Sequence, residues 1–295
     1  MKIGVFGWII SDLTDVDSDK IRGALDLGFT GLGAHVTVPA NRIADETIEQ
    51  FRAAMAGLPV DFLQLWGPYP CIVTPDEDAR RAGVAQAREI VRLAARLGAP
   101  MAGVRPTSLN PRYEWAAHPD NYTPETEERF YRSLMEILET AHEAGVGIVL
   151  ETHQTTVLDS PQRIRRIIER TGSDRVRVNI DPANFVTDFR TAFNPAPMIH
   201  ELFDVLGPYA DTVHVKDIYL EDRFVVHINE TVIGTGIMDL DTVLRRAQEI
   251  LPDGYVVVEH LPLNLIPLAK RNLDRKIKEL GIPVGAVYRL PGYAG

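Results

Sequence analysis

Four residues whose side chains bind metal ions occupy equivalent places in four successive parts of the sequence. Each ends or directly follows a short, mainly apolar run, and the four are Glu151, Asp181, His214 and Glu259. If such runs are buried strands, a charged carboxylate at the end of each costs several kcal/mol unless it has a partner. One cation held between the four side chains would remove that cost. The pattern therefore predicts a metal site.

The predicted ligand set has three carboxylates and one imidazole, with no thiolate. Oxygen-rich sets suit Mn²⁺, Mg²⁺ or Co²⁺ in an octahedral shell with room for two substrate oxygens, and mixed nitrogen and oxygen sets also bind Zn²⁺. We expect one divalent ion, with Mn²⁺ favoured. A metal-free alternative pairs Glu151 and Glu259 with Lys216 and Arg105 as internal salt bridges.

Two further residues share the spacing of the ligands. His153 lies two residues after Glu151, and Lys216 two residues after His214, so strand alternation would direct them to the same side. We expect His153 to act as a general base or to bind a substrate hydroxyl. Lys216 is expected to polarise a carbonyl or assist a dehydration. Either residue can instead be structural, with Lys216 paired to Asp217 or Glu259.

The other candidates are expected to bind substrate. Arg105 ends the fourth apolar run and can hold a substrate anion or a carboxylate. The remaining four residues fall in the first three apolar runs and can either wall a pocket or belong to the core: His35, Gln64, Trp66 and Trp8.

These residues need a framework that brings strand ends together. Eight short apolar runs, typical of strands covered on both faces, are Ile3–Ile10, Phe29–Val36, Val60–Trp66, Met101–Pro106, Gly147–His153, Val176–Asn184, Thr212–Ile218 and Tyr255–Leu261. Amphipathic segments with Pro near their starts or Gly after their ends lie between them, including Asp76–Leu97, Thr123–Ala144, Ser160–Thr171, Pro197–Leu206 and Asp239–Leu251.

Strands that alternate with helices predict parallel βαβ units, and eight repeats predict closure into a (β/α)₈ barrel. Such a barrel needs roughly 250 residues, so the 295 residues are expected to form one domain over 1–295. Residues 261–295 would supply the last helix, Lys270–Leu280, and a short C-terminal extension with Tyr288 and Tyr293. That tail is expected to cover the underside of the barrel or a neighbouring subunit, so the chain is a possible homo-oligomer.

The composition excludes several classes of partner. With 31 Lys+Arg against 41 Asp+Glu, the formal charge is −10, which disfavours nucleic acids and anionic membranes. The single Cys71 excludes an internal disulfide framework or a Cys-rich metal site. Neither a signal peptide nor a membrane span is recognisable. We therefore expect a cytoplasmic protein.

The chain resembles the xylose isomerase-like TIM-barrel superfamily of sugar isomerases, ketose 3-epimerases and inosose dehydratases. The residues that carry the resemblance are Glu151, Asp181 in Asp-Pro-Ala-Asn, His214 in His-Val-Lys-Asp, the turn Gly234-Thr235-Gly236, and Glu259. It implies that Glu151 and Glu259 are both metal ligands and the acid/base pair. The implied function is a sugar isomerase or epimerase that abstracts a proton beside a carbonyl through a metal-stabilised enolate.

One position departs from the ketose epimerases. Three residues after the aspartate ligand they usually carry His, and this chain has Asn184, which can bind substrate by hydrogen bonds but cannot titrate. A metal-dependent lyase or dehydratase of a cyclic keto-polyol or 3-keto-sugar is therefore the alternative, with His153 or Lys216 as its acid. An endonuclease-like phosphodiesterase is disfavoured, because Gln64 and Asn184 replace zinc-binding His residues. A non-catalytic ligand-binding barrel also remains open.

Overall fold

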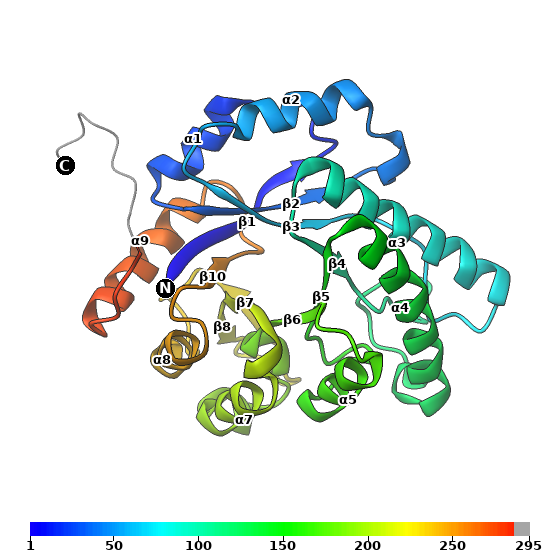
Figure 1. Ribbon diagram of the computed structural model, residues 1–295. Coiled ribbons are helices and arrows are strands. Elements are labelled where there is room, and N and C mark those ends of the chain that lie inside the picture. Colours follow the sequence, from blue (N-terminus) through cyan, green and yellow to red (C-terminus); the bar gives the residue numbers. More distant parts are fainter. Residues whose placement is uncertain (286–295) are drawn as a thin grey trace.

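Eight parallel strands close into a barrel in the computed structural model, which describes residues 1–285 (Figure 1). Around the barrel their order is β1, β10, β7, β6, β5, β4, β3 and β2. Their bounds are β1 (Lys2–Ser11), β2 (Gly31–Val36), β3 (Asp61–Trp66), β4 (Met101–Val104), β5 (Gly147–Glu151), β6 (Val176–Ile180), β7 (Ala210–Val215) and β10 (Tyr255–Val258). The predicted (β/α)₈ barrel is confirmed.

Helices surround the strands on the outside of the barrel (Figure 1). They are α1 (Ser18–Asp26), α2 (Asp45–Met55), α3 (Glu77–Leu97), α4 (Pro124–Ala144), α5 (Pro161–Thr171), α6 (Phe189–Phe193), α7 (Ala196–Leu206), α8 (Leu240–Ile250) and α9 (Ile266–Glu279). The ends of α3, α4 and α5 follow the predicted cap chemistry. The Asp76 carboxylate, for example, accepts hydrogen bonds from the first backbone N–H groups of α3, and Gly98 ends that helix with φ at 85°.

The last helix is longer than predicted. It begins at Ile266 rather than Lys270, because Pro267 in the first turn has the backbone angle of a helix and no N–H to leave unsatisfied. The predicted contacts of the tail residues Tyr288 and Tyr293 lie outside the described residues. Within the part of the chain that the structure describes, no helix combines the length and apolar character needed to cross a membrane.

Several strands end earlier than predicted, and each ends where the chain turns into the site. Strand β5 stops at Glu151, so His153 lies in the following turn, where its backbone N–H donates to Leu158. Strand β6 stops at Ile180, because Pro182 opens a short 3₁₀ helix, η3 (Pro182–Phe185).

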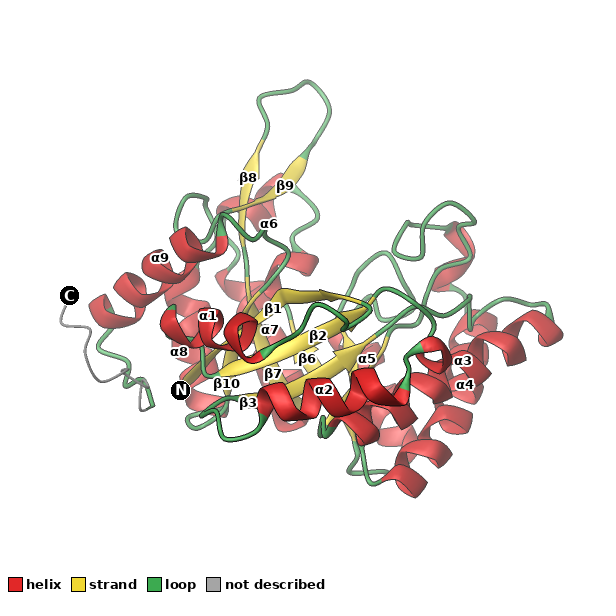
Figure 2. Cartoon of the chain, turned by 90° about the horizontal axis from the view of Figure 1, so that it is seen from above, coloured by secondary structure: helices red, strands yellow, loops and turns green. Residues whose placement is uncertain are grey.

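A hairpin projects from the barrel where the sequence predicted one continuous strand over Thr212–Ile218. The chain leaves the barrel at Lys216, and β8 (Asp217–Leu220) pairs antiparallel with β9 (Ile228–Thr231) (Figure 2). The Asp217 carboxylate accepts hydrogen bonds from the backbone N–H groups of Gly234, Gly236 and Met238. Asp217 thereby secures the base of the hairpin.

The interior of the barrel pairs large side chains with glycines. A Cβ atom on Gly33 would lie 2.1 Å from the Phe6 ring, and one on Gly103 would lie 2.0 Å from the Trp66 ring. These glycines therefore create the space in which Phe6 and Trp66 pack. Both aromatic rings reach the cavity at the mouth of the barrel, so this packing shapes the site.

Candidate metal centre and substrate cavity

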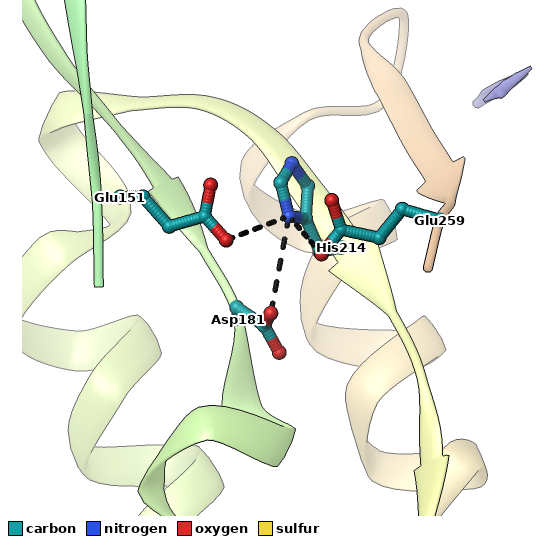
Figure 3. Close-up of side chains that lie close together, drawn as sticks. All are labelled: Glu151, Asp181, His214 and Glu259. Carbon is teal, nitrogen blue, oxygen red and sulfur yellow. Dashed lines mark ion pairs between the residues drawn. The ribbon is translucent and has the colours of Figure 1, made fainter. Parts of the chain in front are cut away.

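The four predicted ligands meet at the C-terminal ends of four neighbouring strands. Glu151 ends β5, Asp181 directly follows β6, His214 lies in β7, and Glu259 directly follows β10, and these strands are adjacent in the barrel. All four residues are buried, and one potential ligand atom from each lies within 4.8 Å of the others (Figure 3). Parallel strands of a barrel end at one face, so this convergence follows from the predicted topology.

The polar atoms at the centre lack hydrogen bonds. His214 Nδ1 lies 2.8 Å from Glu259 Oε1, 3.6 Å from Glu151 Oε1 and 3.9 Å from Asp181 Oδ2. Within residues 1–285, neither ring nitrogen of His214 nor Asp181 Oδ2 or Glu259 Oε1 has a hydrogen-bond partner of acceptable geometry. Buried polar atoms are normally satisfied. Ligand atoms about 2.0–2.2 Å from a shared ion lie up to about 4.4 Å apart, so a divalent ion fits after a small contraction.

Lys216 balances part of the charge of this cluster. Its buried Nζ lies 2.7 Å from Asp181 Oδ2 and 2.8 Å from Glu259 Oε1. Three carboxylates and one ammonium leave two negative charges, which one divalent cation would neutralise. The metal-free alternative pairs Glu151 and Glu259 with Lys216 and Arg105. Of these ion pairs only Lys216–Glu259 is present, because Arg105 pairs with Glu114 instead.

Electrostatics set the protonation of the cluster. Burial opposes charge on His214, but the carboxylates of Glu259 and Glu151 outweigh burial and raise its pKa to about 10. Burial raises the pKa of Asp181 to about 6, against the opposing effect of Lys216. For Glu259, the charges of His214 and Lys216 outweigh burial and hold its pKa well below its usual range.

A cavity of about 770 Å³ opens above the cluster at the mouth of the barrel. Glu151 and Glu259 both line it, so these two ligands are also accessible to a bound molecule. Four other predicted site residues line the same cavity, namely His35, Trp66, Arg105 and His153. Burial lowers the pKa of His35 and of His153 to about 4, which leaves both imidazoles neutral at physiological pH.

Thr155 occupies one ring nitrogen of His153. The backbone N–H of Thr155 donates to His153 Nδ1 at 3.4 Å, and the Thr155 hydroxyl oxygen lies 2.6 Å from the same nitrogen. That hydroxyl also donates to the carbonyl of Trp115 at 2.6 Å. Nε2 is therefore the nitrogen left to exchange a proton or a hydrogen bond with a bound molecule. The ring packs on Trp115, with centroids 4.9 Å apart.

Arg105 is placed at the cavity but its charge is already paired. Its Nε lies 2.7 Å from Glu114 Oε2, and Nη1 donates to the carbonyl of Gly67 at 2.6 Å. The guanidinium also stacks on the Tyr69 ring at 4.2 Å. Arg105 therefore fixes the loop in which Glu114 lies between the cavity-lining residues Tyr113 and Trp115.

Two predicted substrate-binding residues lie elsewhere. Gln64 is fully buried inside the barrel, where it exchanges hydrogen bonds with Asn179 and accepts one from Trp66. It belongs to the core of the barrel, one layer below Trp66. Trp8 donates to the carbonyl of Lys20 on the outside of the barrel. An irregularity in β1 at Gly7, whose φ is 88°, shifts the alternation between Phe6 and Trp8.

Asn184 was predicted to bind substrate but is not among the residues that line the cavity. Its Nδ2 donates to the carbonyl of Thr152 at 3.0 Å, and its Oδ1 lies 3.5 Å from Lys216 Nζ. It therefore helps to place Lys216. The predicted contact with substrate is replaced by these contacts because η3 turns residue 184 back toward the end of β5.

The comparisons with known proteins agree with the barrel fold. Residues 21–278 match the model of the xylose isomerase-like TIM barrel family. The chain belongs to this family. Among curated proteins no significant match was found.

Several solved structures share the fold at low sequence identity. A D-tagatose 3-epimerase-like protein is 20% identical, with a TM-score of 0.72 over 95% of this chain and 98% of the other. The 3-keto-D-glucoside 4-epimerase of E. coli is 19% identical, with a TM-score of 0.68 over 94% and 99%. A family member from Mycobacterium smegmatis in complex with magnesium is also 19% identical, with a TM-score of 0.68 over 95% and 96%.

Two titratable residues that line the cavity were not predicted from the sequence. Glu230 on β9 and His260 both line the cavity and lie 3.1 Å apart. The carboxylate of Glu259 raises the pKa of His260 to about 9. His260 has φ at 59°, a strained conformation that is uncommon outside functional sites. The position of His260 directly after Glu259 could have indicated its place at the site. No sequence pattern could have indicated Glu230, because only the β8–β9 hairpin brings it to the cavity.

Proposed function

We propose that this protein is a divalent-metal-dependent isomerase or epimerase of a sugar or related hydroxy-ketone, acting by proton abstraction beside the carbonyl. The observation that carries the proposal is the arrangement of Glu151 and Glu259. Their carboxylates face each other on opposite sides of the His214 ring (Figure 3), and both line the cavity. Two carboxylates on opposite sides of one substrate can remove a proton from one face and return one to the other.

The neighbouring residues support acid/base roles for Glu151 and Glu259 and ligand roles for Asp181 and His214. Lys216 and His214 keep Glu259 ionised, so Glu259 can accept a proton at neutral pH. Asp181 and His214 are enclosed below the cavity and would act as ligands only. When bound, the ion would supply a Lewis acid for the carbonyl, the neighbouring hydroxyl and the enolate. We infer that Mn²⁺ is the physiological ion, since oxygen-rich ligand sets suit it.

Proton exchange tests the proposal. Candidate ketoses incubated in D₂O with the Mn²⁺-loaded protein should incorporate deuterium at the carbon beside the carbonyl. Glu151→Gln and Glu259→Gln should each slow this exchange by about 10²–10⁴-fold. Glu143→Gln is the matched control, because Glu143 is exposed near the C-terminal end of α4, at the opposite end of the barrel. Normal exchange in both site variants would refute the proposal.

A lyase that acts on a cyclic keto-polyol or 3-keto-sugar is the second candidate. His153 favours it, because its Nε2 is free to exchange a proton and the residue lines the cavity. Such an enzyme would also exchange the proton beside the carbonyl but would then expel a neighbouring group. Mass detection of a dehydrated or unsaturated product, lost in His153→Gln while deuterium exchange continues, would identify the lyase.

A further inference from the structure

The cavity has two chemically different halves. Its floor carries the candidate metal cluster, of which Glu151 and Glu259 line the cavity. The walls above the floor are largely apolar and are lined by Ile10, Trp66, Tyr113, Trp115, Leu261 and Pro262. The volume of about 770 Å³ lies toward the upper end of the roughly 300–1,000 Å³ of cavities that enclose drug-sized ligands. A free monosaccharide would fill only part of it.

The apolar groups come from opposite sides of the barrel mouth. Ile10 in β1 and the Leu261–Pro262 segment after β10 belong to neighbouring strands, whereas Tyr113 and Trp115 follow β4 across the barrel. Ile10 is 57% exposed and Tyr113 is 60% exposed. Exposed apolar side chains that face one another across a cavity indicate a ligand with an apolar part.

The charges at the cavity oppose an anionic substrate. Glu230 adds a carboxylate at the mouth. The Arg105 side chain is only 2% exposed and is paired with Glu114. The His260 ring already contacts the Glu230 carboxylate at 3.1 Å. Among the described residues, no cation lining the cavity is therefore free to bind a phosphate group.

We propose that the substrate is an uncharged keto-sugar or keto-polyol that carries an apolar or aromatic substituent, in the manner of a glycoside with an aromatic aglycone. This inference rests on the proposed function, which places the polyol part at the metal cluster. The substituent would lie between Ile10 on one side and Tyr113 and Trp115 on the other. Flat aromatic groups gain most from such a wall, because aromatic side chains stack on them.

Calorimetric titration of the Mg²⁺-loaded protein with three non-reacting probes tests the inference. Phenyl β-glucoside should bind about tenfold more tightly than methyl β-glucoside, and a hexose phosphate should bind no better than the methyl glucoside. Tyr113→Ala and Trp115→Ala should each remove most of the phenyl preference while binding of the methyl glucoside is unchanged. Phe193→Ala is the control, because Phe193 is 74% exposed on α6, away from the cavity wall.

The outcomes separate this inference from the proposed function. Equal binding of the phenyl and methyl glucosides, or tighter binding of the hexose phosphate, overturns the inference even if free ketoses exchange their protons. A phenyl preference that depends on Tyr113 and Trp115 supports it. If that preference persists when no substrate exchanges a proton, the proposed reaction is wrong and the apolar subsite stands.

Discussion

Binding of a divalent ion to the metal-free protein should release about one proton per chain near pH 8. The pKa of His214 is raised to about 10 by the carboxylates of Glu259 and Glu151, which outweigh burial. His214 is therefore protonated in the metal-free protein at this pH, and an imidazolium cannot coordinate an ion. Asp181, with a pKa of about 6, is already ionised and adds almost nothing to the release.

The same reasoning gives the pH dependence of affinity. Between about pH 7 and 9 the apparent Kd should fall about tenfold for each unit of pH, because one proton competes with the ion. Calorimetric titration with Mn²⁺ in two buffers of different ionisation enthalpy, at the same pH, measures the number of protons released. His200→Gln, which changes an exposed histidine on α7, should behave as the unmodified protein. No proton release, together with an affinity independent of pH, would refute the assignment of His214.

Three further predictions concern stability. In chelator-treated protein, the pKa of His214 is raised from 6.5 to about 10. The protonated imidazole therefore stabilises the fold fully below pH 6.5, and the free energy of unfolding should fall by roughly 2–3 kcal/mol between about pH 7 and 9. Urea titrations should show this decline without metal and lose it with Mn²⁺. Arg80 is 2% exposed and ion-paired with two carboxylates, so Arg80→Ala should cost about 3 kcal/mol, whereas Arg81→Ala, at a side chain 67% exposed, should cost at most about 0.5 kcal/mol. Gly103→Ala would place a Cβ 2.0 Å from the Trp66 ring and should lower the free energy of unfolding by about 1–3 kcal/mol. Tryptophan fluorescence should change as well. An unchanged urea midpoint would contradict this packing.

The convergence of the four candidate ligands could be predicted from sequence, because all four obey one local rule. Glu151, Asp181, His214 and Glu259 each lie at the C-terminal end of an apolar run, and parallel strands in a barrel bring those ends together. Small errors in strand length do not matter to this argument. Strand β6, for example, ends at Ile180 rather than residue 184, yet Asp181 still points to the centre.

The residues that were misplaced depend on features that local patterns do not encode. Trp8 lies on the outer face because of the irregularity at Gly7, and alternation alone cannot reveal such a shift. Gln64 is inward-facing but lies one layer too deep, beneath Trp66. Glu230 reaches the cavity only through the β8–β9 hairpin, which pairs two weakly apolar segments across a loop. These contacts arise from tertiary packing, whose geometry a single sequence does not specify.

The central claim is that one divalent ion is held by Glu151, Asp181, His214 and Glu259. Anomalous diffraction from crystals grown with Mn²⁺ tests it most directly. We predict one strong peak per chain, with an atom of each of the four side chains about 2.0–2.3 Å away, and its loss in crystals of Glu151→Gln. Two results would contradict the claim: the four side chains and Lys216 fully ordered without an anomalous peak between them, or a Mn²⁺ ion bound by other residues.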